Sequence, residues 1–457
     1  MTIVFLFIIL SLFTGCSAQS AGLTVTIEGT QYEEPLIYQY LNVFNTQSHV
    51  ESNSAVQLVY FYQLGAIDDL PDNTVTRLEQ NIVGIVTHDE PISSAQLASL
   101  IQSGGEILQL PYILTAVDVV YNLSTTAYIN STIGLNQNSG LGTPNGALNL
   151  TAPILSSIFQ GKITTWNDPS ILAINPNLSP EYNTPIKLVA RGDDASTTND
   201  LTRYFSVLDP TWGAATSTPE RFAVNAIYAP DEPGMVQAMQ ATFGTIGYTH
   251  RRTARAAGLF AANLMNKAGN FVYPSQSALQ AAELSMTADN LFPAFSGDWS
   301  TIASSQASGS LVYPCTAFIY FYVYANPLKI ADTATNGMQS DIVAEFLQFV
   351  ISNPALTTGY VPMSTAFYDK IRVNLDAIDQ ANKAQAALII NNNSNSYTSY
   401  KDSVIGLGVL CAIIIIILIV IGYGYYKLYN KVSKGDVHSK VSSHEITHRS
   451  SHMENHM

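Results

Sequence analysis

Cysteine is almost absent from this chain of 457 residues, which contains only three. Cys16 lies in an N-terminal apolar segment and Cys411 in a C-terminal one, so Cys315 is the single cysteine of the long region between them. One cysteine can neither build an intrachain disulfide framework nor supply a cysteine-based metal site. The fold must therefore be held together by its hydrophobic core.

Charge is scarce as well, because charged residues make up only 12% of the chain, against 47% hydrophobic residues. So low a charge content points to an extracellular or membrane-tethered protein. The formal net charge is -14, so the basic footprint of a nucleic-acid-binding protein is missing. An acidic balance does not exclude an anionic ligand, since a site built from oriented dipoles acts locally.

Sequence motifs that are typical of enzymes and metal sites are also missing. The chain has no Gly-x-Ser-x-Gly elbow, Walker loop, His-Glu-x-x-His motif or EF-hand loop. Between the two apolar segments the only histidines are His49, His88 and His250, and no spacing supports a Ser-His-Asp triad. We therefore expect no enzyme, no metal site and no cofactor.

Two apolar segments are present, one at each end. Residues 1–18 predict a signal peptide that ends in the small residues Cys16-Ser17-Ala18, and residues 12–16 alternatively resemble a lipoprotein box. Residues 404–426 contain no charged side chain, and their length suffices for a bilayer core of about 30 Å. Lysines follow this segment, so we expect a single-pass type I protein with its ectodomain extracellular or lumenal.

The flanks of the apolar C-terminal segment differ in character. Residues 391–403 are rich in Asn and Ser and predict a stalk. The tail, residues 427–457, carries four histidines spaced by four, which would align as metal ligands on a helix, although its serine-rich composition favours disorder. Glycosylation acceptor triplets occur at Asn122, Asn130, Asn149, Asn177 and Asn392, and predict a glycoprotein.

The long central region alternates strand patterns with helix patterns. Strands are expected at 23–27, 56–62, 81–87, 106–121 with an interruption at Pro111, 186–189, 246–248 and 311–324. Helices are expected at 35–44, 94–101, 152–159, 235–242, 341–351 and 365–378. Such alternation predicts an α/β architecture with mainly parallel sheets.

One strand-to-helix loop, residues 190–200, combines the parts of an anion site. Free N–H groups at a helix start and the hydroxyls of Ser196 and its neighbours would donate to an anion, as would the guanidinium of Arg191. The alternative is an ordinary capped helix, with Arg191 paired to Asp193 or Asp194.

A second loop delivers Asp89 at the carboxyl end of a buried strand, where α/β folds place ligands. A carboxylate can accept a hydrogen bond from a protonated anion such as hydrogen phosphate. Sulfate lacks that proton and would leave the buried acceptor unsatisfied. The alternative is that Asp89 caps a helix that begins near Pro91.

Several segments between residues 23 and 372 resemble, in order, the periplasmic phosphate-binding proteins, which are the solute-capturing subunits of bacterial phosphate ABC importers. The most specific match is 152–169, APILSSIFQGKITTWNDP, to the family pattern Leu-x-x-Ile-Phe-x-Gly-x-Ile-x-x-Trp-Asn-Asp-Pro. Residues 191–198, RGDDASTT, resemble Arg-Ser-Asp-Gly-Ser-Gly-Thr-Thr, and 87–92, THDEPI, resemble Ala-Ser-Asp-Ala-Pro-Leu. Shorter matches lie at 29–35, 119–123, 244–248, 272–275 and 359–362.

This resemblance implies two α/β lobes of the type II periplasmic-binding-protein kind, joined by crossover strands and closing on a ligand. Lobe one would be residues 19–112 plus 315–390, and lobe two 113–314. The implied function is capture or sensing of extracellular phosphate, with an unknown transporter or signalling partner. Two alternatives remain: a phosphatase-like enzyme on the same fold, and a cell-surface recognition protein that has lost phosphate binding.

The resemblance also implies which residues contact phosphate. Asp89 would accept the phosphate proton. Arg191, held by Asp193, would donate to the phosphate, as would Ser196 and Thr197 at the helix start and the backbone N–H of Tyr32. Gln31 would replace a hydroxyl donor of the family, and Gln63 could substitute for a segment of the family that is missing near residues 62–66. The loop departs from the family because Ala195 replaces a serine and Ser196 a glycine. Each lost neutral donor would cost about 1 kcal/mol or more.

Overall fold

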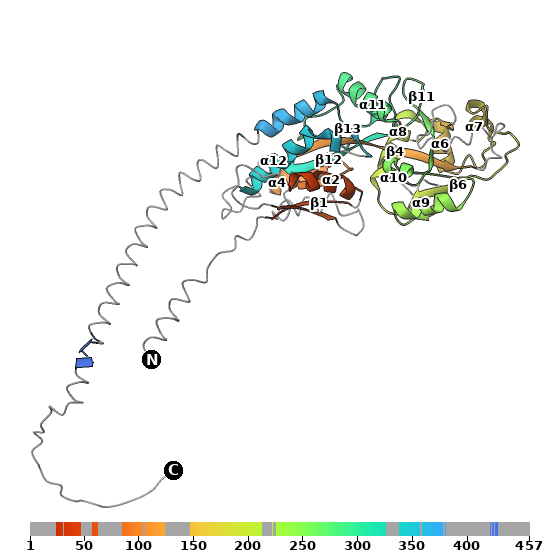
Figure 1. Ribbon diagram of the computed structural model, residues 1–457. Helices are drawn as coiled ribbons and strands as arrows, with labels where there is room; N and C mark the ends of the chain where they lie inside the picture. The colour runs from red at the N-terminus through yellow and green to blue at the C-terminus, as the bar shows by residue number, and fades with distance from the viewer. Residues whose placement is uncertain are drawn as a thin grey trace, which may run out of the picture. The chain divides into compact units, whose positions relative to one another are not determined.

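The computed structural model describes residues 24–30, 32–46, 57–62, 85–103, 106–123, 147–212, 225–325, 338–356 and 359–377, with isolated positions at 222, 380, 421, 423, 424, 426 and 427. Met1–Ala386 form one compact unit and Ala387–Met457 a second. The helices and strands discussed below belong to the first unit (Figure 1).

The predictions for the two ends fall almost wholly outside the described residues. The signal peptide at 1–18, the stalk at 391–403 and the tail beyond residue 427 lie there, as does most of the apolar segment 404–426. Within the residues that the structure describes, no helix is long and apolar enough to cross a membrane.

A mixed β-sheet is the framework of the first unit, with strand order β2-β1-β3-β12-β4-β8-β6-β7. β1 is parallel to β2 and β3, and β6 is parallel to β7 and β8, whereas β12 and β4 run antiparallel to their neighbours. The α/β class is as predicted, but the expectation of mainly parallel sheets is wrong because two long central strands reverse direction. The strands are β1 (Thr24–Gly29), β2 (Gln57–Tyr62), β3 (Ile85–His88), β4 (Ile107–Asn122), β6 (Lys187–Arg191), β7 (Ile227–Ala229), β8 (Thr245–His250) and β12 (Thr316–Tyr324).

β4 is shared between the two halves of this sheet. It pairs with β12 from Ile107 to Ala116 and with β8 from Val117 to Asn122. All of its residues except the last are buried. A single strand therefore runs through the first half (β2, β1, β3, β12) into the second (β8, β6, β7).

Pro111 does not interrupt β4, contrary to the prediction. The register with β12 shifts here, because Tyr320 lies opposite Pro111 and Ile319 lies opposite Ile113, which leaves Tyr112 of β4 as the extra residue. A bulge at this point accommodates a residue that has no N–H for the ladder, so the strand continues.

Short strands complete the sheets. β9 (Phe260–Ala261) and β13 (Val361–Pro362) add to β4, and a separate three-stranded sheet has the order β11-β10-β5. The members of this second sheet are β5 (Asn149–Leu150), β10 (Asn263–Met265) and β11 (Phe271–Val272).

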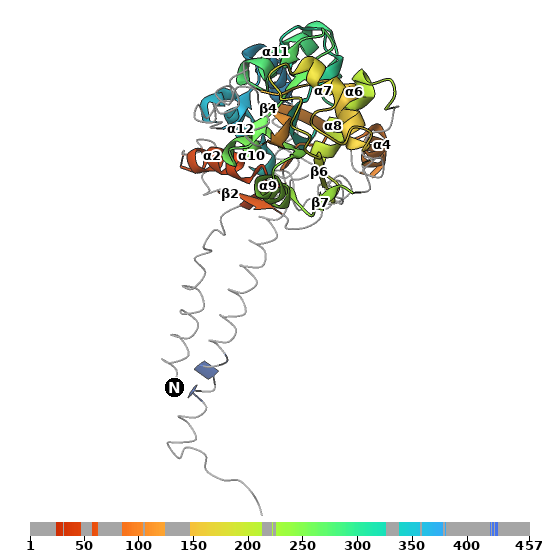
Figure 2. The same ribbon diagram turned by 90° about the vertical axis from the view of Figure 1, so that its right-hand side faces the viewer.

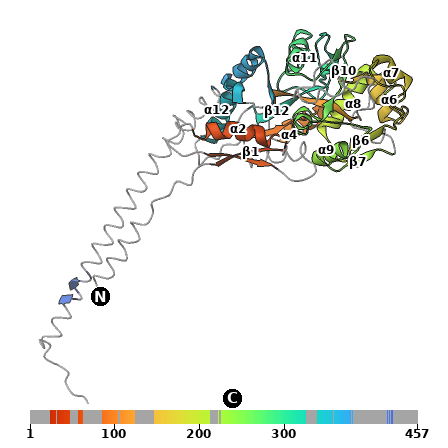
Figure 3. The ribbon, with the colours of Figure 1, turned by 45° about the vertical axis from the view of Figure 1, so that its right-hand side comes forward.

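Helices pack against each half of the main sheet. α2 and α12 contact each other beside β1, α9 packs on β6, β7 and β8, and α6 contacts α8 (Figures 2 and 3). The helices are α2 (Glu34–Phe44), α4 (Ser94–Ser103), α6 (Ala152–Phe159), α7 (Pro169–Ile174), α8 (Ser196–Leu208), α9 (Glu232–Ala241), α10 (Arg251–Ala256), α11 (Gln276–Ala288) and α12 (Met338–Ser352), followed by a helix at 365–377.

Three element boundaries differ from the predicted ones for identifiable reasons. β6 ends at Arg191 and α8 begins at Ser196, so the loop is 192–195 and is much shorter than the predicted 190–200. α9 begins three residues before the predicted start because the Asp231 side chain accepts from the N–H of Gly234 and caps it. β12 begins at Thr316 rather than at 311, because the residues before it form turns.

The sequence motif around Trp166 is a packing motif. Trp166 is fully buried, and its Nε1–H donates to the carbonyl of Gly244 at 3.0 Å. Gly244 has φ of 85°, a left-handed conformation that suits glycine, and leads directly into β8. Trp166 thus ties the segment after α6 to the start of a strand that carries site residues.

We expect Trp166→Ala to lower the free energy of unfolding by about 3–5 kcal/mol, because it leaves a large cavity in the core. Trp166→Phe keeps most of the volume and should cost only about 1–2 kcal/mol. Urea unfolding of the purified protein measures both. A loss below about 1 kcal/mol for the alanine variant would contradict this packing role.

Candidate anion-binding site

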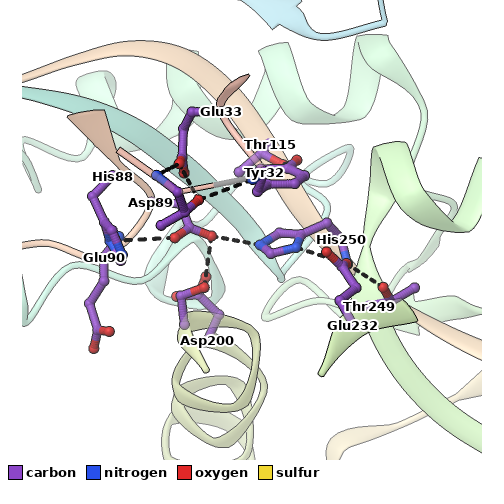
Figure 4. A network of polar contacts seen from close by, with 12 residues as sticks. Tyr32, Glu33, His88, Asp89, Glu90, Thr115, Asp200, Glu232, Thr249 and His250 are labelled. Atoms are coloured by element: carbon purple, nitrogen blue, oxygen red, sulfur yellow. Dashed lines mark hydrogen bonds and ion pairs between the residues drawn. The ribbon is translucent and has the colours of Figure 1, made fainter. Parts of the chain in front are cut away.

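Four separate elements bring polar side chains to one buried place. Asp89 directly follows β3, Ser196 opens α8, His250 ends β8 and Tyr32 precedes α2. Figure 4 shows Asp89 at the centre of this network, with His88 on one side and His250 on the other. Each side chain sits at or next to the end of an element, where the backbone is fixed by the sheet.

Asp89 is 8% exposed, and its Oδ2 atom receives two hydrogen bonds. Ser196 donates through Oγ at 2.7 Å, and His250 through Nε2 at 2.6 Å. Burial raises the pKa of this carboxyl, but the hydrogen bond and charge of His250 outweigh burial and hold the pKa well below its usual range. Asp89 is therefore ionised at neutral pH. At the start of α4 it is Oγ of Ser93 that accepts from the backbone N–H of Gln96, at 3.4 Å.

His250 is held from three sides. Its Nδ1 atom lies 2.9 Å from Oε1 of Glu232, which also accepts from the backbone N–H of His250 at 3.0 Å. Its ring stacks on that of Tyr32, with centroids 3.8 Å apart and planes at 16°. Burial lowers the pKa of His250, but Glu232 and Asp89 together raise it to about 10.

His88 also faces Asp89 but does not serve it as a donor. Its Nδ1 atom is 3.5 Å from Oδ1 of Asp89 and accepts the backbone N–H of Glu90 at 2.8 Å. Burial lowers the pKa of His88, so the ring is neutral and Nδ1 presents a lone pair. Among the described residues, Oδ1 of Asp89 therefore receives no hydrogen bond.

Arg191, the last residue of β6, is 4% exposed and forms a two-pronged ion pair with Asp193. Its Nε donates to Oδ1 of Asp193 at 2.6 Å, and its Nη2 donates to Oδ2. The predicted pairing is thus present, and it fixes the guanidinium plane. The pairing alone does not separate an anion site from a capped helix.

The start of α8 has donor groups that no side chain among the described residues satisfies. Its N-cap residue is Ala195, which provides no side-chain acceptor for the first N–H groups of the helix. The hydroxyl of Thr197 is completely buried and has no hydrogen-bond partner in the described part of the chain. An unused buried donor is costly unless a ligand satisfies it.

Other predicted contacts are engaged elsewhere or lie outside the described residues. The backbone N–H of Tyr32, expected to meet phosphate, donates to Oγ1 of Thr30 at 3.2 Å. The phenol of Tyr32 pairs with Thr115 at 2.8 Å. Gln31 and Gln63 are outside the described residues.

Sequence reasoning missed the residues that surround Asp89, namely His250, Glu232, Glu33 and Glu90. Burial raises the pKa of Glu33 to about 8, with the negative charge of Asp89 adding to the effect. Burial likewise raises the pKa of Glu90 to about 7. A usable signal existed for His250, since it follows the motif 244–248 at the end of a buried strand, the position that singled out Asp89.

The space beside Asp89 is small. A cavity of about 20 Å³ is lined by Asp89, Asp200, Arg203 and Cys315, among others. This volume holds one water molecule and no tetrahedral anion. In the described part of the chain no group of side chains is arranged to hold a metal ion.

Two of the three described glycosylation triplets use their amides inside the fold. Asn122 donates from Nδ2 to the carbonyl of Met239, and Asn149 donates from Nδ2 to the carbonyl of Ile174. Asn177 is exposed. Asn130 and Asn392 lie outside the described residues.

The chain belongs to the PBP superfamily, because the model of the PBP superfamily domain matches residues 17–354. The phosphate-binding protein PstS of Methanocaldococcus jannaschii is 26% identical over 307 residues, which cover 64% of this chain and 72% of that protein. PstS of Xylella fastidiosa is 24% identical over 358 residues, which cover 76% of this chain and 83% of the Xylella protein. The prediction is therefore confirmed at the level of the PBP superfamily.

Solved structures agree on the fold. A high affinity periplasmic phosphate-binding protein (PfluDING) bound with phosphate has a TM-score of 0.51 at 19% identity, covering 77% of this chain and 93% of that one. A human phosphate binding apolipoprotein has a TM-score of 0.50 at 16% identity, and the match covers 76% of this chain and 93% of the apolipoprotein. The predicted periplasmic-binding-protein-like α/β fold is confirmed at this level.

We expect Glu33→Gln to make the stability of the fold less dependent on pH. In the folded protein the pKa of Glu33 is about 8, above the ordinary 4.5, so the neutral carboxyl stabilises the fold at low pH and this contribution is lost as pH rises toward 8. Glutamine cannot ionise, so the fall in Tm between about pH 5 and about pH 8.5 should be smaller in the variant. The half-buried neighbour Glu34→Gln is the matched control, and equal slopes in both variants would contradict the assignment.

Proposed function

We propose that this protein binds inorganic phosphate, or a related tetrahedral oxyanion, between Asp89 and the loop that runs from Arg191 to Thr197. Binding involves no chemical reaction. The relatives named above are described as phosphate-binding proteins, which supports this ligand class. They are not described as enzymes.

One observation carries the proposal: a buried, ionised carboxylate faces an uncapped helix start. Ser196 lies 2.7 Å from Asp89, and the next residue, Thr197, holds a buried hydroxyl without a partner in the described residues. Donors for anionic oxygens and an acceptor for an acidic proton therefore stand side by side. A hydrogen phosphate ion needs both, and sulfate needs only the donors.

Oδ1 of Asp89 is the atom that fits the ligand's proton. The other oxygen, Oδ2, already accepts from Ser196 and His250. Arg191, oriented by Asp193, and the N–H groups at the start of α8 would face the remaining phosphate oxygens. Gln31 and Gln63 stay as proposed additional donors.

Access to this site requires movement, because Asp89, Arg191 and Thr197 are all buried. We propose that lobe one, residues 19–112 and 315–390, separates from lobe two, residues 113–314, to admit the ligand. The hydrogen bonds from Ser196 and His250 to Asp89 would join the two lobes when they are closed.

We further propose that the protein works at a membrane surface as a capture or sensing protein. The support is the apolar segment 404–426, followed by lysines, and the signal-peptide pattern at 1–18. The protein would be a single-pass type I membrane protein with the phosphate site outside, and Asn177 is the exposed glycosylation candidate among the described residues.

We expect Arg191→Ala to weaken phosphate binding by about tenfold to a hundredfold, and Thr197→Val by about tenfold. A hydrogen bond to a charged group contributes about 1.5–3 kcal/mol, and tenfold corresponds to about 1.4 kcal/mol. Isothermal titration calorimetry of the purified protein measures both. Thr287→Val removes a hydroxyl from α11, away from the site, and serves as the control.

Absence of heat and of a thermal shift with phosphate in the wild-type protein would contradict the proposed function. That result would favour a recognition protein that has lost its ligand, an alternative supported by Ala195 and by the intramolecular partners of Asp89. Hydrolysis of a chromogenic phosphoester, abolished in Arg191→Ala, would favour the enzyme instead.

A further inference from the structure

His250 lies between two carboxylates and contacts both through its ring. Nε2 is 2.6 Å from Asp89 and Nδ1 is 2.9 Å from Glu232. A neutral imidazole has one N–H and one lone pair, so it can donate to only one of these partners. Only the doubly protonated ring satisfies both contacts, and His250 is therefore a cation in this arrangement.

Asp89 needs such a cation. It is buried next to Glu33 and Glu90, two carboxyls whose pKa values burial raises. Arg191 does not supply the charge because its guanidinium is bound to Asp193, and His88 is neutral and does not donate. Among the described residues the cation in contact with Asp89 is His250.

We propose that His250, held in place by Glu232, is a positioning residue that determines which anion the site accepts. It occupies Oδ2 of Asp89 and keeps the carboxylate charged, so that Oδ1 remains an acceptor for the ligand's proton. This inference rests on the proposed phosphate binding and adds the residue pair that sets the selectivity.

Removal of His250 should change the chemistry of Asp89. A buried carboxyl without its cation takes up a proton at mildly acidic pH. A protonated carboxyl is a donor as well as an acceptor, and a donor suits an oxygen of sulfate as well as one of phosphate. Discrimination between the two anions should therefore become dependent on pH.

Other titratable groups surround the pair and must be accounted for. Those that interact electrostatically with Asp89 or His250 from neighbouring elements are Tyr32 and Glu33 before α2, His88 and Glu90 beside Asp89, Asp118 on β4, Asp200 on α8, Glu232 on α9, and Tyr320 and Tyr322 on β12. All of them are present in the wild type and in His250→Gln, and all except Glu232 are present in Glu232→Gln. A comparison of variant with wild type at each pH therefore isolates the effect of His250.

The test is calorimetric titration of the full-length protein with phosphate and with sulfate at about pH 5.5 and about pH 8.5. The wild type should prefer phosphate strongly at both values. His250→Gln should bind sulfate at least about tenfold more tightly relative to phosphate at the lower pH, and should regain much of its preference at the higher pH. Glu232→Gln, which weakens the hold on His250, should shift the ratio in the same direction by less.

Arg372→Gln is the control, because it removes a positive charge from an exposed ion pair with Asp369. It should leave the phosphate-to-sulfate ratio unchanged at both pH values. An unchanged ratio in His250→Gln, with phosphate still bound, would overturn this inference and leave the proposed function standing. A wild-type protein that binds no phosphate would overturn both.

A second measurement does not depend on a variant that folds. The ¹⁵N chemical shifts of the His250 ring in the wild-type protein report its protonation, and we expect a doubly protonated ring at about pH 8, well above the ordinary pKa of about 6.5. A neutral His250 ring at that pH would overturn the inference even if the protein binds phosphate.

Discussion

The contact between His250 and Asp89 is the interaction on which the rest of the site depends. It joins residues 161 positions apart, one at the end of a strand in each half of the sheet, and both are almost fully buried. A buried carboxylate that loses its cation either takes up a proton or pays the cost of an unpaired charge. Glu232 and the ring of Tyr32 hold His250 in the one orientation that prevents this. The arrangement around Asp89 is thus a fixed row of two carboxylates, Asp89 and Glu232, with the cation of His250 between them.

The sheet makes these positions reproducible. Asp89, Arg191 and His250 each stand at or directly after the end of a buried strand, so their backbone atoms are set by ladder hydrogen bonds rather than by loop conformation. Loops between such strands can change while the ends stay fixed. Arg191 is accordingly paired with Asp193 in a loop that contains Ala195 and Ser196, the two residues that depart from the pattern the resemblance implies.

The sequence was sufficient for the fold class and for local pairs, and insufficient for the contacts that cross the molecule. The helices at 35–44 and 152–159 follow from apolar periodicity, and the pair Arg191–Asp193 lies within three residues, so both could be predicted. The position of His250 at a strand end was a usable signal, but its role could not be predicted, because its partners Glu232 and Asp89 lie 18 and 161 positions away. The course of β4 through Pro111 was missed for a similar reason, since the register that accommodates Pro111 is set by pairing with β12, more than 200 positions later.

The course of β4 bears on how the two halves can move. A flexible linker would let them swing apart with little resistance, but β4 passes from one half into the other as a continuous, hydrogen-bonded strand. The separation proposed above would therefore twist or bend this strand. In the proposed opening, β4 would act as a spring between the halves, and its restoring force would not depend on any ligand.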